Sequence, residues 1–128
     1  MMRAAGTLAL CGTLLAGASS PALAVAPPPK VQLKIVDAAK SGVTKTVWLH
    51  CAPAGGTHPN ARAACRQLER VGGKPADLNV HPNAVCTKEL APHAVVVVGR
   101  WYSSRVQWAK VFANGCLVRA ATGAVVSL

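Results

Sequence analysis

The sequence predicts an α+β fold in which an antiparallel β-sheet is covered on one face by helix. Three observations lead to this prediction. About five segments have the composition of β-strands, and those that neighbour in sequence are joined by short turns. One segment between them has the periodicity of an amphipathic helix. The chain is long enough for one modest domain and too short for two.

Five segments are predicted to be strands. Residues 31–35 alternate apolar and polar side chains, and residues 46–51 are rich in β-forming residues. Because only a short turn separates these two segments, we expect them to be antiparallel neighbours. The other predicted strands are 94–98, 105–112 and 124–128, with turns at 41–43 and 99–104 and irregular loops at 52–60 and 74–84.

Residues 61–71 are predicted to form the helix. Asn60 is a suitable N-cap, and the adjacent glycines Gly72 and Gly73 allow the left-handed geometry that ends a helix. The apolar residues recur on one side of the helix, at Ala64, Leu68 and Val71. The charged residues lie largely on the other sides, at Arg62, Arg66, Glu69 and Arg70.

The strand at 94–98 has consequences for assembly. Its four consecutive valines leave apolar groups on both faces of the sheet, and a domain with one clear helix covers only one face. We therefore expect the other face to pack against a second copy in a two-fold homodimer. Coverage of that face by loops is the alternative. The tryptophans are expected in the core or at this interface: Trp48, Trp101 and Trp108.

Residues 1–24 have the features of a secretory signal peptide. Arg3 supplies the positive charge, residues 4–17 form an uncharged apolar run, and Ala22-Leu23-Ala24 matches a cleavage site. The run is shorter than the ~20 residues of a membrane-spanning helix, so a membrane anchor is the less favoured alternative. We expect Cys11 to be removed with this segment.

The predicted exported chain therefore begins at Val25. Residues 25–30 are expected to form a flexible, proline-rich leader, and residues 31–128 the folded domain. An even number of cysteines in an exported chain predicts two disulfides, and three pairings remain possible. The four cysteines are Cys51, Cys65, Cys86 and Cys116.

Metal binding and catalysis are not expected. The chain has no C-x-x-C pair, and its histidines, His50, His58, His81 and His93, lack the spacing of metal ligands. No catalytic motif is present, and the acidic residues are too few and too scattered for an acid/base pair. We expect no cofactor, and we expect His58 to order its loop.

The net charge of +10, or +9 without Arg3, raises the question of an anionic partner. The basic residues are spread through the chain, and the aromatic residues are too few for a base-stacking surface. The charge pattern therefore favours a soluble cationic secreted domain, with neither nucleic acid nor membrane as its partner. A cationic binding protein for anionic surfaces or nucleic acid is the alternative function.

Residues 85–92 form the segment that points to a function. Lys88 lies two residues after Cys86, in a stretch short of helix formers that Pro92 closes. In a secreted, disulfide-bonded protein this arrangement suggests a loop that a serine protease binds like a substrate. The lysine would enter the specificity pocket of the protease, and the cysteine would anchor the loop. A solvated surface lysine is the alternative.

Several motifs, in order along the chain, resemble one protein family. They are Leu49-His50-Cys51-Ala52-Pro53, Gly56-Thr57-His58-Pro59, Ala64-Cys65, Val71-Gly72-Gly73, Leu78-Asn79, Cys86, Pro92, Gly99, Trp101, Arg105-Val106 and Val111-Phe112-Ala113-Asn114-Gly115-Cys116. With these residues the sequence resembles the Streptomyces subtilisin inhibitors over most of the chain after residue 24, and residues 86–116 align without a gap.

The resemblance implies a fold and an activity. It implies a five-stranded antiparallel sheet with two short helices, the disulfides Cys51–Cys65 and Cys86–Cys116, and a homodimer. The partners would be trypsin-like and subtilisin-like serine proteases.

The resemblance also implies that Lys88–Glu89 is the reactive bond. Val85, Cys86, Thr87 and Lys88 would then be P4 to P1 and Glu89 would be P1′, with Leu90 as a further contact. Two residues depart from the family pattern: Thr87 stands where proline is frequent, and Glu89 is an uncommon acidic P1′.

Overall fold

The structure is a computed structural model that describes Gly6, Gly12, Gly17 and residues 27–128. Apart from those three glycines, the predicted signal peptide lies outside the described residues, as do Cys11 and the predicted new N-terminus, Val25. None of the helices in the described part of the chain is long and apolar enough to cross a bilayer.

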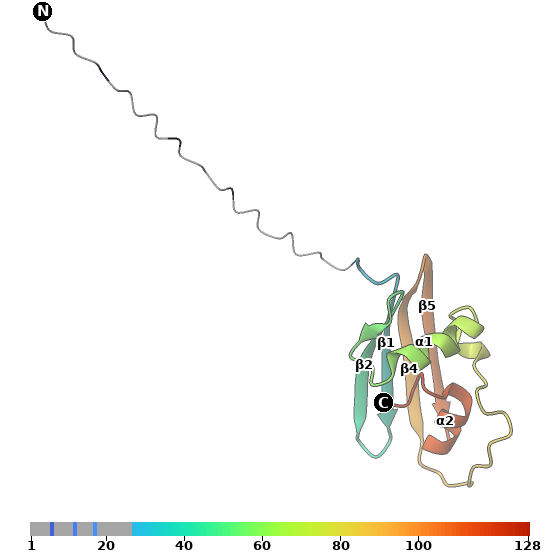
Figure 1. Ribbon diagram of the computed structural model, residues 1–128. Helices are drawn as coiled ribbons and strands as arrows, with labels where there is room; N and C mark the ends of the chain where they lie inside the picture. Colours follow the sequence, from blue (N-terminus) through green and yellow to red (C-terminus); the bar gives the residue numbers. More distant parts are fainter. Residues whose placement is uncertain (1–5, 7–11, 13–16, 18–26) are drawn as a thin grey trace, which may run out of the picture.

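The described chain contains a five-stranded sheet in the order β3-β2-β1-β4-β5 (Figure 1). All neighbouring strands are antiparallel, as predicted. The strands are β1 (Val31–Ala39), β2 (Thr44–Cys51), β3 (Gly55–Gly56), β4 (His93–Trp101) and β5 (Ser104–Phe112). In the central strand β1, Ile35 lies opposite Val47 of β2 on one side and Val97 of β4 on the other.

Two helices, α1 (Ala61–Arg70) and α2 (Gly115–Thr122), lie against the same face of this sheet (Figure 1). A short 3₁₀ turn, η1 (Pro75–Asp77), follows α1. Alternate side chains of the strands point towards the helices and form the core with them. Its fully buried members include Leu33, Ile35, Leu49, Val95 and Val97 from the sheet and Ala64 and Leu68 from α1. The predicted α+β architecture is confirmed.

Two predictions about the strands are wrong. Residues 124–128 form no strand; they follow α2 as a turn, and Val125 and Val126 are buried in the core. The fifth strand is β3, in a segment predicted to be a loop because of its prolines and glycines. A two-residue bridge needs only local pairing, with Leu49 opposite Gly56, and composition does not reveal it.

The turn predicted at 99–104 is also placed wrongly. Strand β4 continues to Trp101, and only Tyr102 and Ser103 separate it from β5. Gly99 lies within β4 at φ +145°, where a Cβ atom would come 2.1 Å from the carbonyl oxygen of Gln32 in β1. This glycine therefore permits close approach of two strands and does not end one.

The N-terminal ends of the two helices also differ from the sequence prediction. Asn60 occupies the N-cap position of α1, but its side chain makes no capping hydrogen bond. Asn114 and Gly115 stand at the start of α2, a helix that the residues alone did not predict. Here the Asn114 side chain does cap, accepting a hydrogen bond from the backbone N–H of Leu117 at 3.0 Å.

The second face of the sheet has no helix over it in the described part of the chain (Figure 1). By strand alternation it carries Val36, Trp48, Val96, Val98 and Val111. Trp48 and Val111 are 44% and 68% exposed. The other two tryptophans, Trp101 and Trp108, pack against the core.

Candidate functional site

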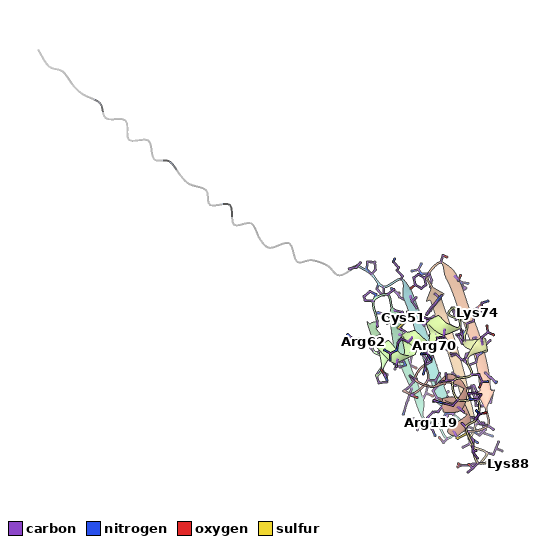
Figure 2. The ribbon with its side chains drawn as sticks, turned by 45° about the vertical axis from the view of Figure 1, so that its right-hand side comes forward. Cys51, Arg62, Arg70, Lys74, Lys88 and Arg119 are labelled. Carbon is purple, nitrogen blue, oxygen red and sulfur yellow. A yellow bond between two sulfur atoms is a disulfide. The ribbon has the colours of Figure 1, made fainter. Side chains whose placement is uncertain are left out.

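Residues 85–92 form an irregular segment without helix or strand between η1 and β4. Val85 is 94% exposed and Leu90 is 79% exposed. Thr87, Lys88 and Glu89 between them are exposed as well, and Lys88 projects from one end of the molecule (Figure 2). Consecutive exposed side chains outside regular structure are accessible to a protease that binds a chain as a substrate.

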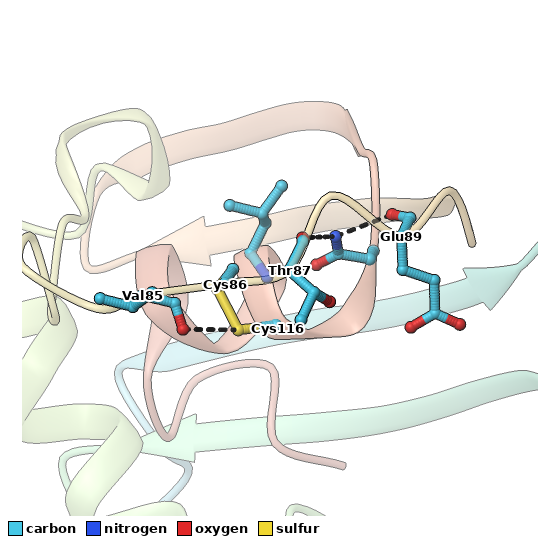
Figure 3. The surroundings of a disulfide bond; sticks show 7 residues. Val85, Cys86, Thr87, Glu89 and Cys116 are labelled. Atoms are coloured by element: carbon cyan, nitrogen blue, oxygen red, sulfur yellow. Dashed lines mark hydrogen bonds between the residues drawn. A yellow bond between two sulfur atoms is a disulfide. The ribbon is translucent and has the colours of Figure 1, made fainter.

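A disulfide joins this segment to the helical layer. Cys86 is bonded to Cys116 in the first turn of α2, with the two Cα atoms 5.7 Å apart (Figure 3). The bond closes a sequence separation of 30 residues and lies two positions before Lys88. The backbone on the N-terminal side of Lys88 is therefore tied to a secondary-structure element.

Asn114 provides a second constraint on the segment. Its side-chain nitrogen Nδ2 donates hydrogen bonds to the carbonyl oxygens of Thr87, at 3.0 Å, and Glu89, at 2.9 Å (Figure 3). The Asn114 side chain is itself fixed, because the residue is only 4% exposed and its Oδ1 atom accepts from Leu117. One buried amide thus holds the two peptide groups that flank the Lys88–Glu89 peptide bond.

The ends of the segment are anchored through the backbone. Beyond Glu89, the N–H of Ala91 donates to the carbonyl of Ala113 at 2.8 Å. The carbonyl of Pro92 accepts from the N–H of Lys40 at 2.8 Å. Upstream, His81 donates to the carbonyl of Ala120 in α2 at 2.8 Å. The exposed residues therefore lie between fixed points on both sides.

A polar contact follows directly after the segment. The Nδ1 atom of His93, the first residue of β4, lies 2.7 Å from the Oδ1 atom of Asp37 in β1. It is the only contact within salt-bridge distance between a basic and an acidic side chain among the described residues, so neither Lys88 nor Glu89 has an intramolecular charge partner there. Both side chains are available to a partner molecule.

The second disulfide and His58 stabilise the opposite part of the molecule. Cys51 in β2 is bonded to Cys65 in α1. His58 is 7% exposed, and its Nδ1 accepts from the backbone N–H of Asn60 at 2.9 Å. Its Nε2 must then carry the proton, which it donates to the carbonyl of Val125 at 2.9 Å. As predicted, His58 orders its loop.

The site residues that the sequence suggested lie in one segment: Val85, Cys86, Thr87, Lys88, Glu89 and Leu90. Sequence reasoning missed Asn114, although it lies in the motif that ends at Cys116. Its two possible signals were its position just before a helix and its closeness to a disulfide cysteine. No group of histidine, cysteine or acidic residues suited to a metal ion is present in the part of the chain that the structure describes.

Comparison with known proteins identifies the family. Residues 28–114 match the model of the subtilisin inhibitor-like family. The chain belongs to this family. It is 45% identical over 89 residues to a subtilisin inhibitor of Streptomyces violaceus, a match that covers 68% of the chain and 61% of that relative. It is 39% identical over 126 residues to a subtilase-type protease inhibitor of Streptomyces coelicolor, covering 91% of the chain and 87% of the relative.

A solved structure shows the same relationship. The chain resembles Streptomyces caespitosus sermetstatin, crystallised in complex with Bacillus licheniformis subtilisin, with a TM-score of 0.56 and 27% identity. The match covers 77% of this chain and all (100%) of that one. The relatives of the chain are named as protease inhibitors, so the family is one of inhibitors and not of enzymes.

Proposed function

We propose that the protein is a secreted inhibitor of serine proteases and that Lys88–Glu89 is its reactive bond. The observation that carries this proposal is the pair of hydrogen bonds from Asn114 to the carbonyl oxygens of Thr87 and Glu89. These bonds fix the backbone on both sides of Lys88 and leave its side chain free. A protease would meet a substrate-like segment whose backbone is already held in place.

Rigidity separates an inhibitor from a substrate in this proposal. A flexible peptide loses conformational entropy when it enters an active site, and that loss subtracts from its affinity. The segment from Val85 to Leu90 is ordered in advance by Cys86–Cys116 and by Asn114. More of the contact energy then remains as affinity, over an interface of ~1,600 Å² as is usual for such complexes.

The same constraints act on the chemical step. When the catalytic serine of the protease attacks the carbonyl carbon of Lys88, the bond to the nitrogen of Glu89 breaks and that nitrogen takes up a proton as the leaving amine. The carbonyl of Glu89 is held by Asn114, and Ala91 is bonded to Ala113. The amine therefore stays beside the acyl group, and reformation of the peptide bond competes with hydrolysis.

Specificity is assigned to Lys88 as P1. In a trypsin-like enzyme its ammonium group would meet the carboxylate at the base of the specificity pocket, in a contact largely removed from water. In a subtilisin-like enzyme the aliphatic part of the side chain would supply most of the contact. Val85, Cys86 and Thr87 would fill P4 to P2, with Glu89 at P1′ and Leu90 after it.

The two departures from the family pattern affect this proposal differently. Thr87 lacks the backbone stiffness of proline at P2, but its carbonyl is held by Asn114, which restricts the same peptide group. Glu89 places a negative charge at P1′, and nothing among the described residues neutralises it. We expect proteases with an acidic surface on the leaving-group side to bind less tightly.

The uncovered sheet face supports a homodimer as the working form. Val36, Trp48, Val96, Val98 and Val111 leave a largely apolar area, with Lys34 between Trp48 and Val98, that no helix covers in the described chain. A second copy would bury this area by two-fold symmetry. Export through the predicted signal peptide accords with the two disulfides, which persist in oxidising compartments.

The test is a titration of residues 25–128 against active-site-calibrated trypsin and subtilisin at nanomolar concentration. Loss of activity in proportion to added inhibitor, ending near one reactive segment per active site, is the expected result. Rapid cleavage at many bonds, or no inhibition of either enzyme, would contradict the proposed function.

A further inference from the structure

The exposed side of α1 carries a row of arginines that the reactive segment does not use. Arg62, Arg66 and Arg70 are spaced by four residues and all three are exposed. Residues four apart lie one above another on the same side of a helix, with Cβ atoms about 6 Å apart. Lys74, also exposed, follows four residues later, beyond the end of the helix. These four residues are called the α1 basic row below.

Helix stability does not account for the row. Like charges four residues apart repel each other, and a cation in the first turn faces the positive end of the helix dipole. Arg62 lies in that first turn, which contains no acidic residue. Across the described residues no arginine or lysine forms a salt bridge, so Glu69 does not neutralise its basic neighbours. Arg70 lies in the last turn, where a cation is favourable, but Arg62 and Arg66 gain no such stabilisation within the described part of the molecule.

The row is separated from the reactive segment. In Figure 2, Arg62, Arg70 and Lys74 follow one another across the helical side of the molecule, whereas Lys88 projects from its lower end. A partner bound along α1 would therefore leave Lys88 accessible.

We propose that the α1 basic row binds a flexible phosphodiester polymer without bases, of the poly(glycerol phosphate) kind found in anionic cell walls. The guanidinium group binds phosphate oxygens in a bidentate way, and arginines one helical turn apart present a line of such groups to a linear polyanion. Because the two disulfides indicate an oxidising compartment, a polymer outside the cell is an accessible partner.

Two other anionic partners fit the row less well. Proteins that bind single-stranded nucleic acid combine phosphate contacts with stacking of bases on aromatic side chains, and α1 has no aromatic residue. An anionic membrane binds amphipathic helices through an apolar face that enters the lipid, but the apolar face of α1 is buried in the core at Ala64 and Leu68. A polymer that offers only phosphate charge needs neither feature.

The inference goes beyond protease inhibition, and one consequence of it rests on the proposed function. A protein held on the polymer through α1 would still expose Lys88, so the inhibitor would be retained on a wall without loss of inhibition. Binding to the polymer is measured without protease, so its failure is distinguishable from failure of the proposed function.

The test measures binding of residues 25–128 to synthetic poly(glycerol phosphate) across a salt series. The variant Arg62→Gln/Arg66→Gln/Arg70→Gln removes three charges from α1 and keeps good helix formers. The matched control Lys30→Gln/Lys40→Gln/Lys45→Gln removes three exposed charges elsewhere. Circular dichroism and denaturant unfolding of each variant check that it is folded.

The expected result is binding that weakens steeply with salt and at least a tenfold loss for the arginine variant. Its salt slope should fall by about 2, since each phosphate contact contributes about 0.7. The control should lose much less affinity. Equal losses in the two variants would show an effect of net charge alone and overturn the proposal, as would no binding. Tighter binding to single-stranded DNA or to anionic vesicles at equal charge concentration would overturn the choice of polymer.

Discussion

The side-chain nitrogen of Asn114 lies 2.9 Å from the carbonyl oxygen of Glu89, the residue that follows Lys88. The same nitrogen also bonds to Thr87, and its oxygen caps α2. One buried side chain therefore connects the start of a helix to the backbone on both sides of the proposed reactive bond.

Replacing the donor of this contact is the first test of its importance. In Asn114→Asp the Oδ1 acceptor for Leu117 remains, whereas the donor to Thr87 and Glu89 is lost. Two neutral hydrogen bonds are worth about 2 kcal/mol together. We expect inhibition of subtilisin to weaken roughly 10- to 100-fold and cleavage of the loop to accelerate, as measured by inhibition constants and by mass spectrometry. The exposed Asn79→Asp is the matched control, and equal effects in the two variants would contradict the role given to Asn114.

Lys88→Ala tests the P1 assignment. Removal of a buried anchor with its charge partner costs at least about 2 kcal/mol at a binding hot spot, which is about 30-fold in affinity. We expect such a loss against trypsin and a smaller loss against subtilisin, which uses the aliphatic part of the side chain. Lys88→Arg should retain trypsin inhibition. Equal losses against both enzymes would argue against Lys88 as P1.

The two disulfides are expected to have different effects. Removing Cys86–Cys116 or Cys51–Cys65 by paired alanine substitutions should lower the free energy of unfolding by about 2–4 kcal/mol in each case. Only the first pair should also convert the inhibitor into a rapidly cleaved substrate, because only Cys86 lies in the segment that meets the protease. Denaturant unfolding and the rate of loop cleavage measure the two effects. Equally fast cleavage in both variants would contradict this division of roles.

Gly73→Ala tests the packing between the end of α1 and β4. A Cβ atom at Gly73 would come 2.2 Å from the ring of Trp101, and the residue has φ +76°. Backbone strain and overpacking together should lower the free energy of unfolding by about 2–4 kcal/mol. Gly72→Ala is the matched control, because Gly72 has φ +61° but no atom within 4 Å of its Cβ position. It should cost only about 1 kcal/mol by denaturant unfolding.

Val98→Asp tests the proposed dimer. Val98 lies on the uncovered sheet face, and a carboxylate there would be buried without a partner in a two-fold interface. We expect the variant to be monomeric in analytical ultracentrifugation at concentrations where the unaltered protein is dimeric. Val43→Asp, at a 58% exposed residue after the turn between β1 and β2, should leave the dimer intact. A monomeric unaltered protein would rule out the dimer.

The sequence predicted the elements whose periodicity extends over several turns or strand residues. The alternation at 31–35 and the valines of 95–98 gave β1 and β4, and the spacing of Ala64 and Leu68 gave α1. It failed where a local feature depends on a distant segment. Gly99 has the composition of a turn residue, but it lies within a strand because the backbone of Gln32 comes close to it. Residues 124–128 have the composition of a strand, but they follow α2 and place Val125 and Val126 in the core.

The residues of the candidate site also differ in whether the sequence could predict them. The exposed segment around Lys88 was predictable because cysteine, lysine and proline occur close together in sequence. Asn114 was not, since its bonds to Thr87 and Glu89 span 27 and 25 residues. Such contacts exist only once β5 and α2 bring the two parts of the chain together.

In the proposed function, Lys88–Glu89 is a substrate-like bond held for slow, reversible cleavage. The most direct measurement is to incubate residues 25–128 with catalytic amounts of trypsin and of subtilisin and to identify the new termini by mass spectrometry over time. We expect one slow cleavage, between Lys88 and Glu89, and partial resynthesis of the intact chain when cleaved protein is returned to enzyme. Fast cleavage at several bonds, or a first cleavage elsewhere in the chain, would contradict it.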